Sequence, residues 1–229
     1  MQDNNKSIVS AILVVGVLVA GAILLKGSSA PTPIPVPVQN NGTPTATTLA
    51  PVGAADRVIG NPQAKVTLVL YEDFQCPFCE KLFTESEKPI EDIYVKDGSV
   101  RLVYRDFAFL GSESVRAAEA ARCAGDQGKF WNYHDYLFTH QNGENQGSFS
   151  DTNLKSFAKN IGLNTTTFNQ CFDSGKYVQA VADSKTEAAT AGVTGTPKGF
   201  ILVNGKIVDT INGAEPYTNV KQKIDNALK

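Results

Sequence analysis

The hydrophobic pattern divides the chain into three stretches. Residues 8–25 carry no charged side chain and are almost all apolar or small. Residues 27–55 are rich in proline, threonine and asparagine, a composition typical of an extended, flexible linker. From residue 56 onward, apolar positions recur with strand and helix periods. The pattern therefore predicts one folded domain over 56–229.

The apolar run over 8–25 predicts a single transmembrane helix, with residues 1–7 as a short cytoplasmic segment. Eighteen helical residues span about 27 Å, which is close to the thickness of the hydrocarbon core of a bilayer. A cleaved signal peptide is the alternative, because the small residues at 28–30 resemble a cleavage site. The length of the run, and Pro31 directly after that site, favour an uncleaved anchor.

Two apolar runs, Val66–Tyr71 and Val100–Arg105, predict buried strands on either side of a helix. Strand, helix and strand in this order predict a parallel pair with a right-handed crossover. Pro89 should kink or end the intervening helix. Residues 112–192 then show helical periodicity without a strand signal, which predicts a helical insertion. Its helices are expected over 113–124, 130–139, 154–161, 168–172 and 177–191, with Asp151 as the cap of the third and Thr165 at the start of the fourth.

The strand pattern returns after the insertion. Gly199–Val203 and Lys206–Ile211 are apolar runs that flank Asn204-Gly205. An Asn-Gly pair between two such runs predicts a hairpin with a type I′ turn. The chain closes with a helix that carries its apolar side chains on one face; these are Val220, Ile224, Ala227 and Leu228.

Cys76-Pro77-Phe78-Cys79 lies between the first predicted strand and the helix that follows it. Two cysteines two residues apart at this junction are typical of a dithiol redox motif. The helix N-terminus stabilises a thiolate on Cys76, and Pro77 suits the first helical turn. Half of a zinc site is the alternative, but the sequence offers no second close Cys/His pair.

Composition narrows the possible functions. The 229 residues carry a formal net charge of −2, so there is no basic footprint and we expect no nucleic-acid partner. The four cysteines allow three pairings; we expect Cys76 to pair with Cys79, and Cys123 with Cys171. The second pair is interpreted as a structural disulfide, with a second redox pair as the alternative. A stable disulfide needs an oxidising compartment, so the catalytic domain is expected on the extracytoplasmic side of the membrane.

Thr194-Gly195-Thr196-Pro197 directly precedes the predicted hairpin. Together with the upstream dithiol motif, it matches the site at which thioredoxin-like folds place a cis-proline. The chain resembles the DsbA-like thiol:disulfide oxidoreductases over 56–229. The resemblance is carried by Tyr71 to Cys79, by Arg122-Cys123-Ala124 with Gln127 to Trp131, and by Gly195-Thr196-Pro197.

The resemblance implies an α/β architecture, the thioredoxin fold, with a central mixed sheet flanked by helices and an inserted helical subdomain. It implies that Cys76 is the exposed nucleophile, that Cys79 is the buried resolving thiol, and that Thr196-Pro197 contacts the substrate. The implied substrates are exported proteins with free cysteines. The implied reoxidant is a quinone-linked membrane protein of the DsbB or vitamin K epoxide reductase type, and no cofactor is required. A disulfide reductase or isomerase is the alternative, as is a non-catalytic binding module or chaperone at the membrane surface.

Two departures from the family pattern affect the expected chemistry. A buried acid often lies six residues before the first cysteine, but Leu70 holds that position here, and it stays open whether Glu72 or Asp73 reaches Cys79. The most strongly oxidising members resemble Cys-Pro-His-Cys, whereas Phe78 offers neither charge nor hydrogen bond. We therefore expect a milder oxidant, with a potential between about −120 and −270 mV.

The aromatic stretch over 130–139 is expected mainly to pack the core of the insertion. A peptide-binding wall is the alternative. His134 and His140 lie in or next to this stretch. We interpret both as surface or hydrogen-bonded residues and not as metal ligands.

Overall fold

The computed structural model describes residues 49–229. The predicted cytoplasmic segment 1–7, the predicted anchor 8–25 and most of the predicted linker 27–55 lie outside the described residues. Within 49–229, no helix combines the length and the apolar character needed to cross a membrane.

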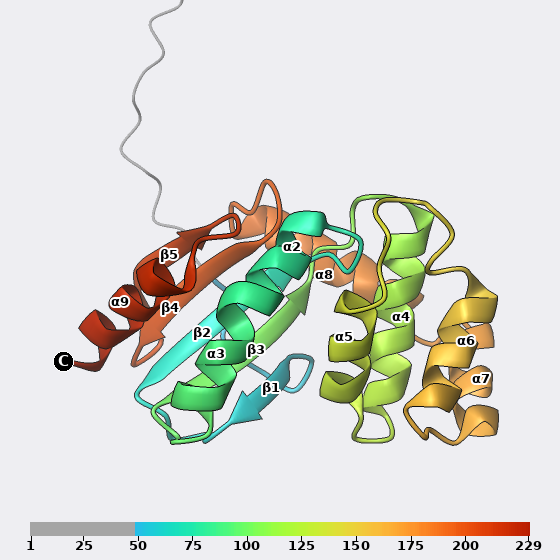
Figure 1. Cartoon of the computed structure of the whole chain (residues 1–229), viewed down its shortest axis with the longest axis horizontal. Helices are drawn as coiled ribbons and strands as arrows, with labels where there is room; N and C mark the ends of the chain where they lie inside the picture. Colours follow the sequence, from blue (N-terminus) through green and yellow to red (C-terminus); the bar gives the residue numbers. More distant parts are fainter. Residues whose placement is uncertain (1–48) are drawn as a thin grey trace, which may run out of the picture. The chain divides into compact units, whose positions relative to one another are not determined.

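A five-stranded mixed sheet forms the centre of the described domain (Figure 1). The strand order is β1-β3-β2-β4-β5, with β2 and β3 parallel and the other neighbours antiparallel. The predicted parallel pair and the predicted hairpin are therefore confirmed. The sequence did not indicate β1, because a four-residue edge strand with alternating burial is too short to show a period. The strands are β1 (Arg57–Gly60), β2 (Val66–Glu72), β3 (Val100–Asp106), β4 (Lys198–Val203) and β5 (Lys206–Asn212).

The β4–β5 hairpin joins the sheet through β4, which pairs with β2. Asn204 and Gly205 have φ values of 51° and 75°, as a type I′ turn requires at its two central residues. Gly199 packs so closely that an added Cβ would lie 2.9 Å from both Ile211 Cβ and Leu70 Cδ2. The close approach of these strands thus depends on a residue without a side chain.

The helix after the dithiol motif runs from residue 77 to residue 95 as four consecutive segments. Pro89 does not end it, since the backbone keeps right-handed helical angles on both sides, at Glu87 and Glu91. The departure from regular α-helix takes the form of π turns before and after the proline, which shift the hydrogen-bond register by one residue. The segments are α2 (Pro77–Leu82), η1 (Phe83–Glu87), α3 (Lys88–Ile90) and η2 (Glu91–Val95).

Five helices lie between β3 and β4, as expected. The predicted cap at Asp151 is wrong by one residue, because Ser150 is the N-cap and Asp151 is already helical. The helix that begins at Thr165 is capped by Asn164, whose side chain accepts a hydrogen bond from the Thr167 N–H. The helices are α4 (Ser112–Gly125), α5 (Phe130–Phe138), α6 (Asp151–Asn160), α7 (Thr165–Asp173) and α8 (Val178–Thr190).

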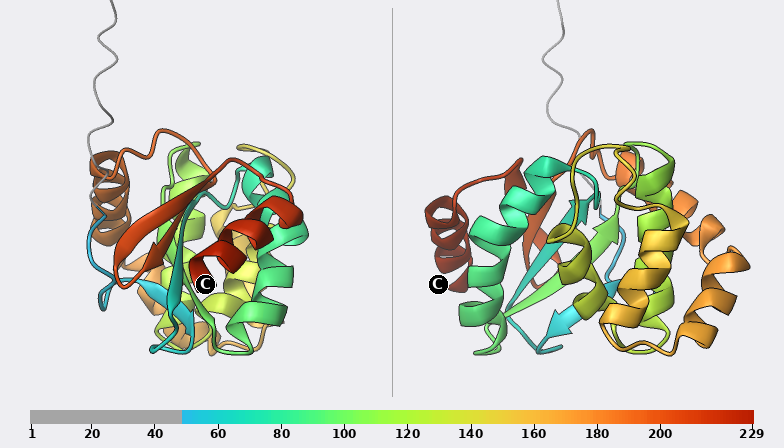
Figure 2. Two further views of the ribbon diagram at one scale, coloured as in Figure 1. Left: turned by 90° about the vertical axis from the view of Figure 1, so that its left-hand side faces the viewer. Right: turned by 45° about the vertical axis from the view of Figure 1, so that its right-hand side comes forward.

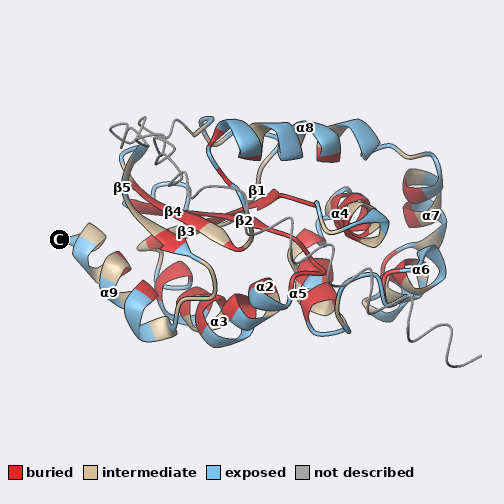
Figure 3. Ribbon diagram, turned by 90° about the horizontal axis from the view of Figure 1, so that it is seen from above, coloured by how far each residue is buried: buried red, intermediate tan, exposed pale blue. Residues whose placement is uncertain are grey.

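The sheet has a different helical cover on each face (Figures 2 and 3). Leu68 and Leu70 face the helix over 77–95 and α9 (Tyr217–Leu228). Val69 and Tyr71 face α8 on the opposite side. Because side chains alternate along a strand, position 72 continues the face of Leu70. Helices α4 to α7 form a block at one end of the sheet, around a core rich in phenylalanine and alanine.

Candidate active site

Cys76 begins the helix that follows β2. It is the N-cap residue with extended angles (φ −74°, ψ 118°), and Pro77 occupies the first helical position. The Cys76 carbonyl accepts hydrogen bonds from the N–H groups of Cys79 (3.0 Å) and Glu80 (3.1 Å). Both cysteines are free thiols in this structure. The Cys76 sulfur therefore lies at a helix N-terminus, where partial positive charge favours an anion.

The two thiols have opposite shifts in acidity. A hydrogen bond from the Cys79 thiol, together with hydrogen bonds from the N–H groups of Cys79 and Phe78, outweighs burial and lowers the pKa of Cys76 to about 6. Burial, the hydrogen bond to Cys76 and the charge of Glu72 raise the pKa of Cys79 well above its usual range. At pH 7 the site thus favours one thiolate, on Cys76, and one neutral thiol, on Cys79.

The loop before β4 lies against the first cysteine. The Thr196–Pro197 peptide bond is cis, and Cys76 in its protonated form donates a hydrogen bond to the Thr196 carbonyl, with 3.5 Å between sulfur and oxygen. The structure thus brings the two motifs together although 120 residues separate them. Phe78 lies at the surface, 62% exposed, whereas both cysteines are buried. The expected burial of Cys79 is therefore confirmed, and the expected exposure of Cys76 is wrong.

Asp73 and Gln141 hold the backbone around the dithiol. The buried Asp73 carboxylate accepts four hydrogen bonds, which tie β2 to the segment between β3 and α4. The Gln141 side chain, from the helical block, donates to the Cys76 carbonyl (3.3 Å). Sequence reasoning did not single out Gln141, because nothing in the pattern after α5 indicates this contact. The four donors to Asp73 are the N–H groups of Gln75, Phe109 and Leu110 and the hydroxyl of Ser114.

Glu72, and not Asp73, is the acid on the Cys79 side of the strand. It is fully buried, and its charge raises the pKa of the Cys79 thiol. The sequence analysis left open which of the two acids reaches Cys79, although the alternation of side chains along the strand distinguishes them. Positions four and six before Cys76 lie on one face of the strand, so Glu72 presents a carboxyl to the side that Leu70 also faces.

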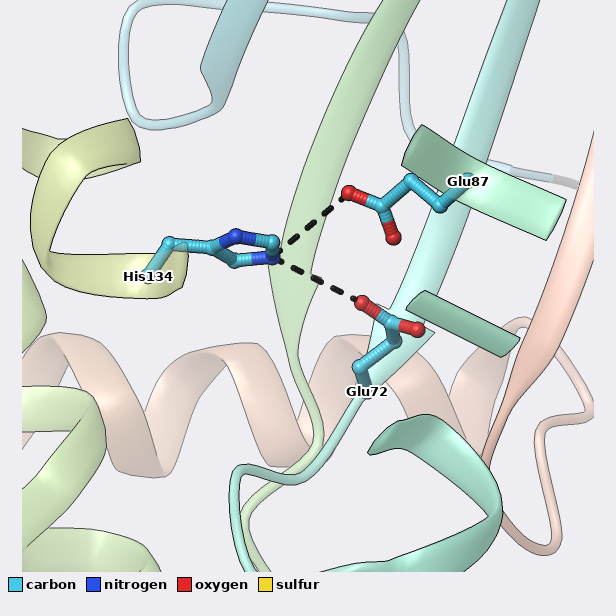
Figure 4. A group of neighbouring side chains, drawn as sticks. All are labelled: Glu72, Glu87 and His134. Carbon is cyan, nitrogen blue, oxygen red and sulfur yellow. Dashed lines mark ion pairs between the residues drawn. The ribbon is translucent and has the colours of Figure 1, made fainter. Parts of the chain in front are cut away.

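His134 is not a surface residue, but it is hydrogen-bonded as expected at one ring nitrogen, since its Nδ1 pairs with Asp135. The side chain is fully buried, and its Nε2 faces the carboxylates of Glu72 and Glu87 (Figure 4). Nε2 has no hydrogen-bond partner among residues 49–229. Burial and the charge of Glu72 raise the pKa of Glu87 well above its usual range. His140, in contrast, is exposed and stacks on Tyr136 at 3.8 Å between ring centroids.

Cys123 and Cys171 form a disulfide that links α4 to α7, with sulfurs 1.97 Å apart. The bond lies in the aromatic core of the helical block, where Tyr133 and Phe138 are fully buried. The expected packing role of the aromatic stretch is confirmed for these two residues. Trp131 and Tyr136 are only partly buried.

Comparison with known proteins identifies the family. Residues 54–226 match the family described as thioredoxin. The chain belongs to the thioredoxin family. It is similar to disulfide bond formation protein D of Bacillus subtilis, with 26% identity over 175 residues that cover 75% of this chain and 77% of that protein. Among solved structures, oxidised BdbD from Bacillus subtilis is 25% identical with a TM-score of 0.69, covering 80% of this chain and 98% of that one.

The Bacillus subtilis disulfide bond formation protein D and BdbD are the kind of protein that the sequence resembles. A Na⁺/H⁺ antiporter, NhaA 1 of Salinispora arenicola, is 32% identical over 153 residues. That match covers 66% of this chain but only 22% of the antiporter. The similarity therefore concerns one part of the antiporter.

Proposed function

We propose that the chain is a thiol:disulfide oxidoreductase that donates the Cys76–Cys79 disulfide to other proteins. The observation that carries this proposal is the asymmetry of the two thiols beside the cis-proline loop. Cys76 has a pKa lowered to about 6, whereas the pKa of Cys79 is raised. A cysteine with a low thiol pKa is a good leaving group from a mixed disulfide. The arrangement thus favours transfer of the disulfide to the substrate.

The reaction proceeds by two exchanges. A substrate thiolate attacks Cys76 Sγ of the oxidised enzyme, a substrate–Cys76 bond forms, and Cys79 leaves and takes up a proton. A second substrate thiolate then attacks the substrate sulfur of this mixed disulfide, and Cys76 leaves as a thiolate. The substrate has lost two electrons and the enzyme dithiol has gained them. The loop at Thr196-Pro197 offers backbone groups to an extended substrate segment next to Cys76.

The acidity of Cys76 supports an oxidant of intermediate strength. Its pKa of about 6 lies between values of about 3.5 for DsbA and about 7 for thioredoxin. Less stabilisation of the reduced thiolate means a less oxidising couple. The exposed side chain of Phe78 adds no charge or hydrogen bond at this site.

The cellular setting completes the proposal. The disulfide that joins α4 and α7 fits an oxidising, extracytoplasmic compartment. The substrates are exported proteins with free cysteines, and a quinone-linked membrane protein of the DsbB or vitamin K epoxide reductase type accepts the electrons. Residues 8–25 anchor the chain in the membrane, residues 27–55 tether the domain, and residues 56–229 form the catalytic unit, with the helical insertion over 112–192.

Stoichiometric transfer from the oxidised chain to a reduced, unfolded protein with several cysteines tests the proposal. We expect rapid disulfide formation in the substrate, no transfer by Cys76→Ser, and an accumulating mixed disulfide when Cys79→Ser is given an oxidised substrate. If the chain reduced insulin disulfides but did not oxidise the reduced substrate, its function would instead be that of a reductase. If the Cys76→Ser variant still prevented the substrate from aggregating, and no thiol exchange occurred, the function would be that of a chaperone.

A further inference from the structure

Glu72, Glu87 and His134 meet in the core with their ligating atoms turned toward one another (Figure 4). His134 Nε2 lies 3.9 Å from a Glu72 oxygen and 3.7 Å from a Glu87 oxygen. All three side chains are essentially without solvent exposure. They come from separate elements: the end of β2, the segment η1 and helix α5.

The facing atoms of this cluster lie at ion-pair distance but form no hydrogen bonds. Among the described residues, neither the four carboxylate oxygens of Glu72 and Glu87 nor Nε2 of His134 has a hydrogen-bond partner. Buried polar groups are usually hydrogen-bonded in folded proteins, and two carboxylates that share a buried site do not both ionise readily unless a cation is present. A divalent cation between them would pair both charges and use the free nitrogen.

The spacing fits a small transition-metal ion. Zn²⁺ binds histidine nitrogen and carboxylate oxygen at about 2.0–2.2 Å, so tetrahedral neighbours lie about 3.4 Å apart. The two distances from His134 Nε2 exceed this by a few tenths of an ångström, and both are too long for hydrogen bonds. Ca²⁺ requires six or more oxygen ligands, and Mg²⁺ a near-ideal octahedron that retains several waters. A site with an imidazole nitrogen therefore favours Zn²⁺.

A hydrogen bond at the other ring nitrogen fixes the orientation of His134. His134 Nδ1 and Asp135 Oδ1 form a hydrogen bond at 3.0 Å. With Nδ1 as the donor, the imidazole keeps the lone pair of Nε2 directed at the two glutamates, as in carboxylate–histidine–zinc arrangements. Asp135 is held in turn by Lys88 at 3.0 Å. Asp135 and Lys88 also line a surface hollow of about 470 Å³.

We propose that Glu72, Glu87 and His134 bind one Zn²⁺ ion. The ion joins strand β2, the helix over 77–95 and helix α5. It is a structural centre, and it takes no part in the electron transfer between thiols.

Zinc titration of the full chain tests this site, provided that the dithiol cannot bind the metal. The test protein is therefore the variant Cys76→Ser/Cys79→Ser, stripped with EDTA and titrated with ZnCl₂ by calorimetry, with the oxidised wild-type chain in parallel. We expect about one Zn²⁺ per chain. Adding Glu87→Gln or His134→Gln should weaken binding more than about 100-fold, and Asp135→Asn about 10- to 100-fold.

Glu119→Gln is the matched control, because Glu119 is also a buried glutamate but pairs with Arg116 on α4. It should leave zinc binding unchanged. Co²⁺ provides a second readout, with visible absorption of a four-coordinate ion and no thiolate charge-transfer band. If His134→Gln unfolds by circular dichroism, Glu87→Gln, which keeps the side-chain shape, decides the question. The proposal would be overturned if neither the Cys76→Ser/Cys79→Ser variant nor the oxidised wild-type chain bound Zn²⁺. It would also be overturned if Zn²⁺ binding survived Glu87→Gln.

Discussion

Removal of the disulfide between α4 and α7 should destabilise the domain without stopping its chemistry. The perturbation is the double variant Cys123→Ala/Cys171→Ala, which leaves no single thiol behind. The bond closes a loop over a sequence separation of 48 residues. In the chain-entropy model, opening such a loop costs about 4 kcal/mol in the free energy of unfolding. For a domain of this size, the melting temperature should fall by about 8 to 16 °C.

The assay compares thermal unfolding of the variant and the wild-type chain, both with the Cys76–Cys79 dithiol reduced. Disulfide transfer to a reduced substrate is then measured well below both melting temperatures, and should be equal in the two proteins. Cys76→Ser supplies the opposite control, inactive but with the α4–α7 bond intact. A variant that melts within a degree or two of wild type, or one that keeps its stability and loses transfer, would refute the structural role and favour a redox relay.

Three further predictions concern the active site. Alkylation of Cys76 by iodoacetamide should rise with pH to a plateau, with a midpoint near its pKa of about 6, because the depressed pKa leaves the thiolate above pH 6 and the thiol below. Cys79→Ser should change this midpoint; an unchanged profile would show that Cys79 does not set the acidity of Cys76. Phe78→His should make the couple more oxidising by about 30 to 60 mV, the worth of one hydrogen bond to a thiolate, whereas Phe78→Ala should leave the potential unchanged. Asp73→Asn should cost about 2 to 3 kcal/mol in urea unfolding, since an amide group cannot accept all four hydrogen bonds; a cost below about 0.5 kcal/mol would contradict this.

The parts of the fold that rest on local patterns were accessible from the sequence. The runs at 66–71 and 100–105 are continuous and apolar, and both are central strands in the structure. Asn204 and Gly205 are the residue types that a type I′ turn requires, so the hairpin was predictable. The shift in strand pairing between Ile201 and Leu202 was not. Strand β1 was not predicted, because its four residues, two partly buried and two exposed, are too few to show a period in the sequence. At Pro89, tertiary packing of the helix against the sheet outweighed the local cost of the missing N–H.

The dithiol and the cis-proline loop were also accessible, since each is a compact motif with its own local chemistry. The Glu72–His134 encounter was not, because the two residues lie on β2 and α5 and meet only when the helical block folds against the sheet. A histidine in an aromatic helix has no local feature that reveals which polar group it will face. The contact of Gln141 with Cys76 is of the same kind.

Redox titration of the Cys76–Cys79 pair against glutathione tests the central claim most directly. The account predicts a reduction potential between about −120 and −270 mV, in the range of enzymes that donate disulfides or exchange them with the glutathione pool. A potential at or below about −270 mV, the thioredoxin value, would contradict it and make the chain a reductant.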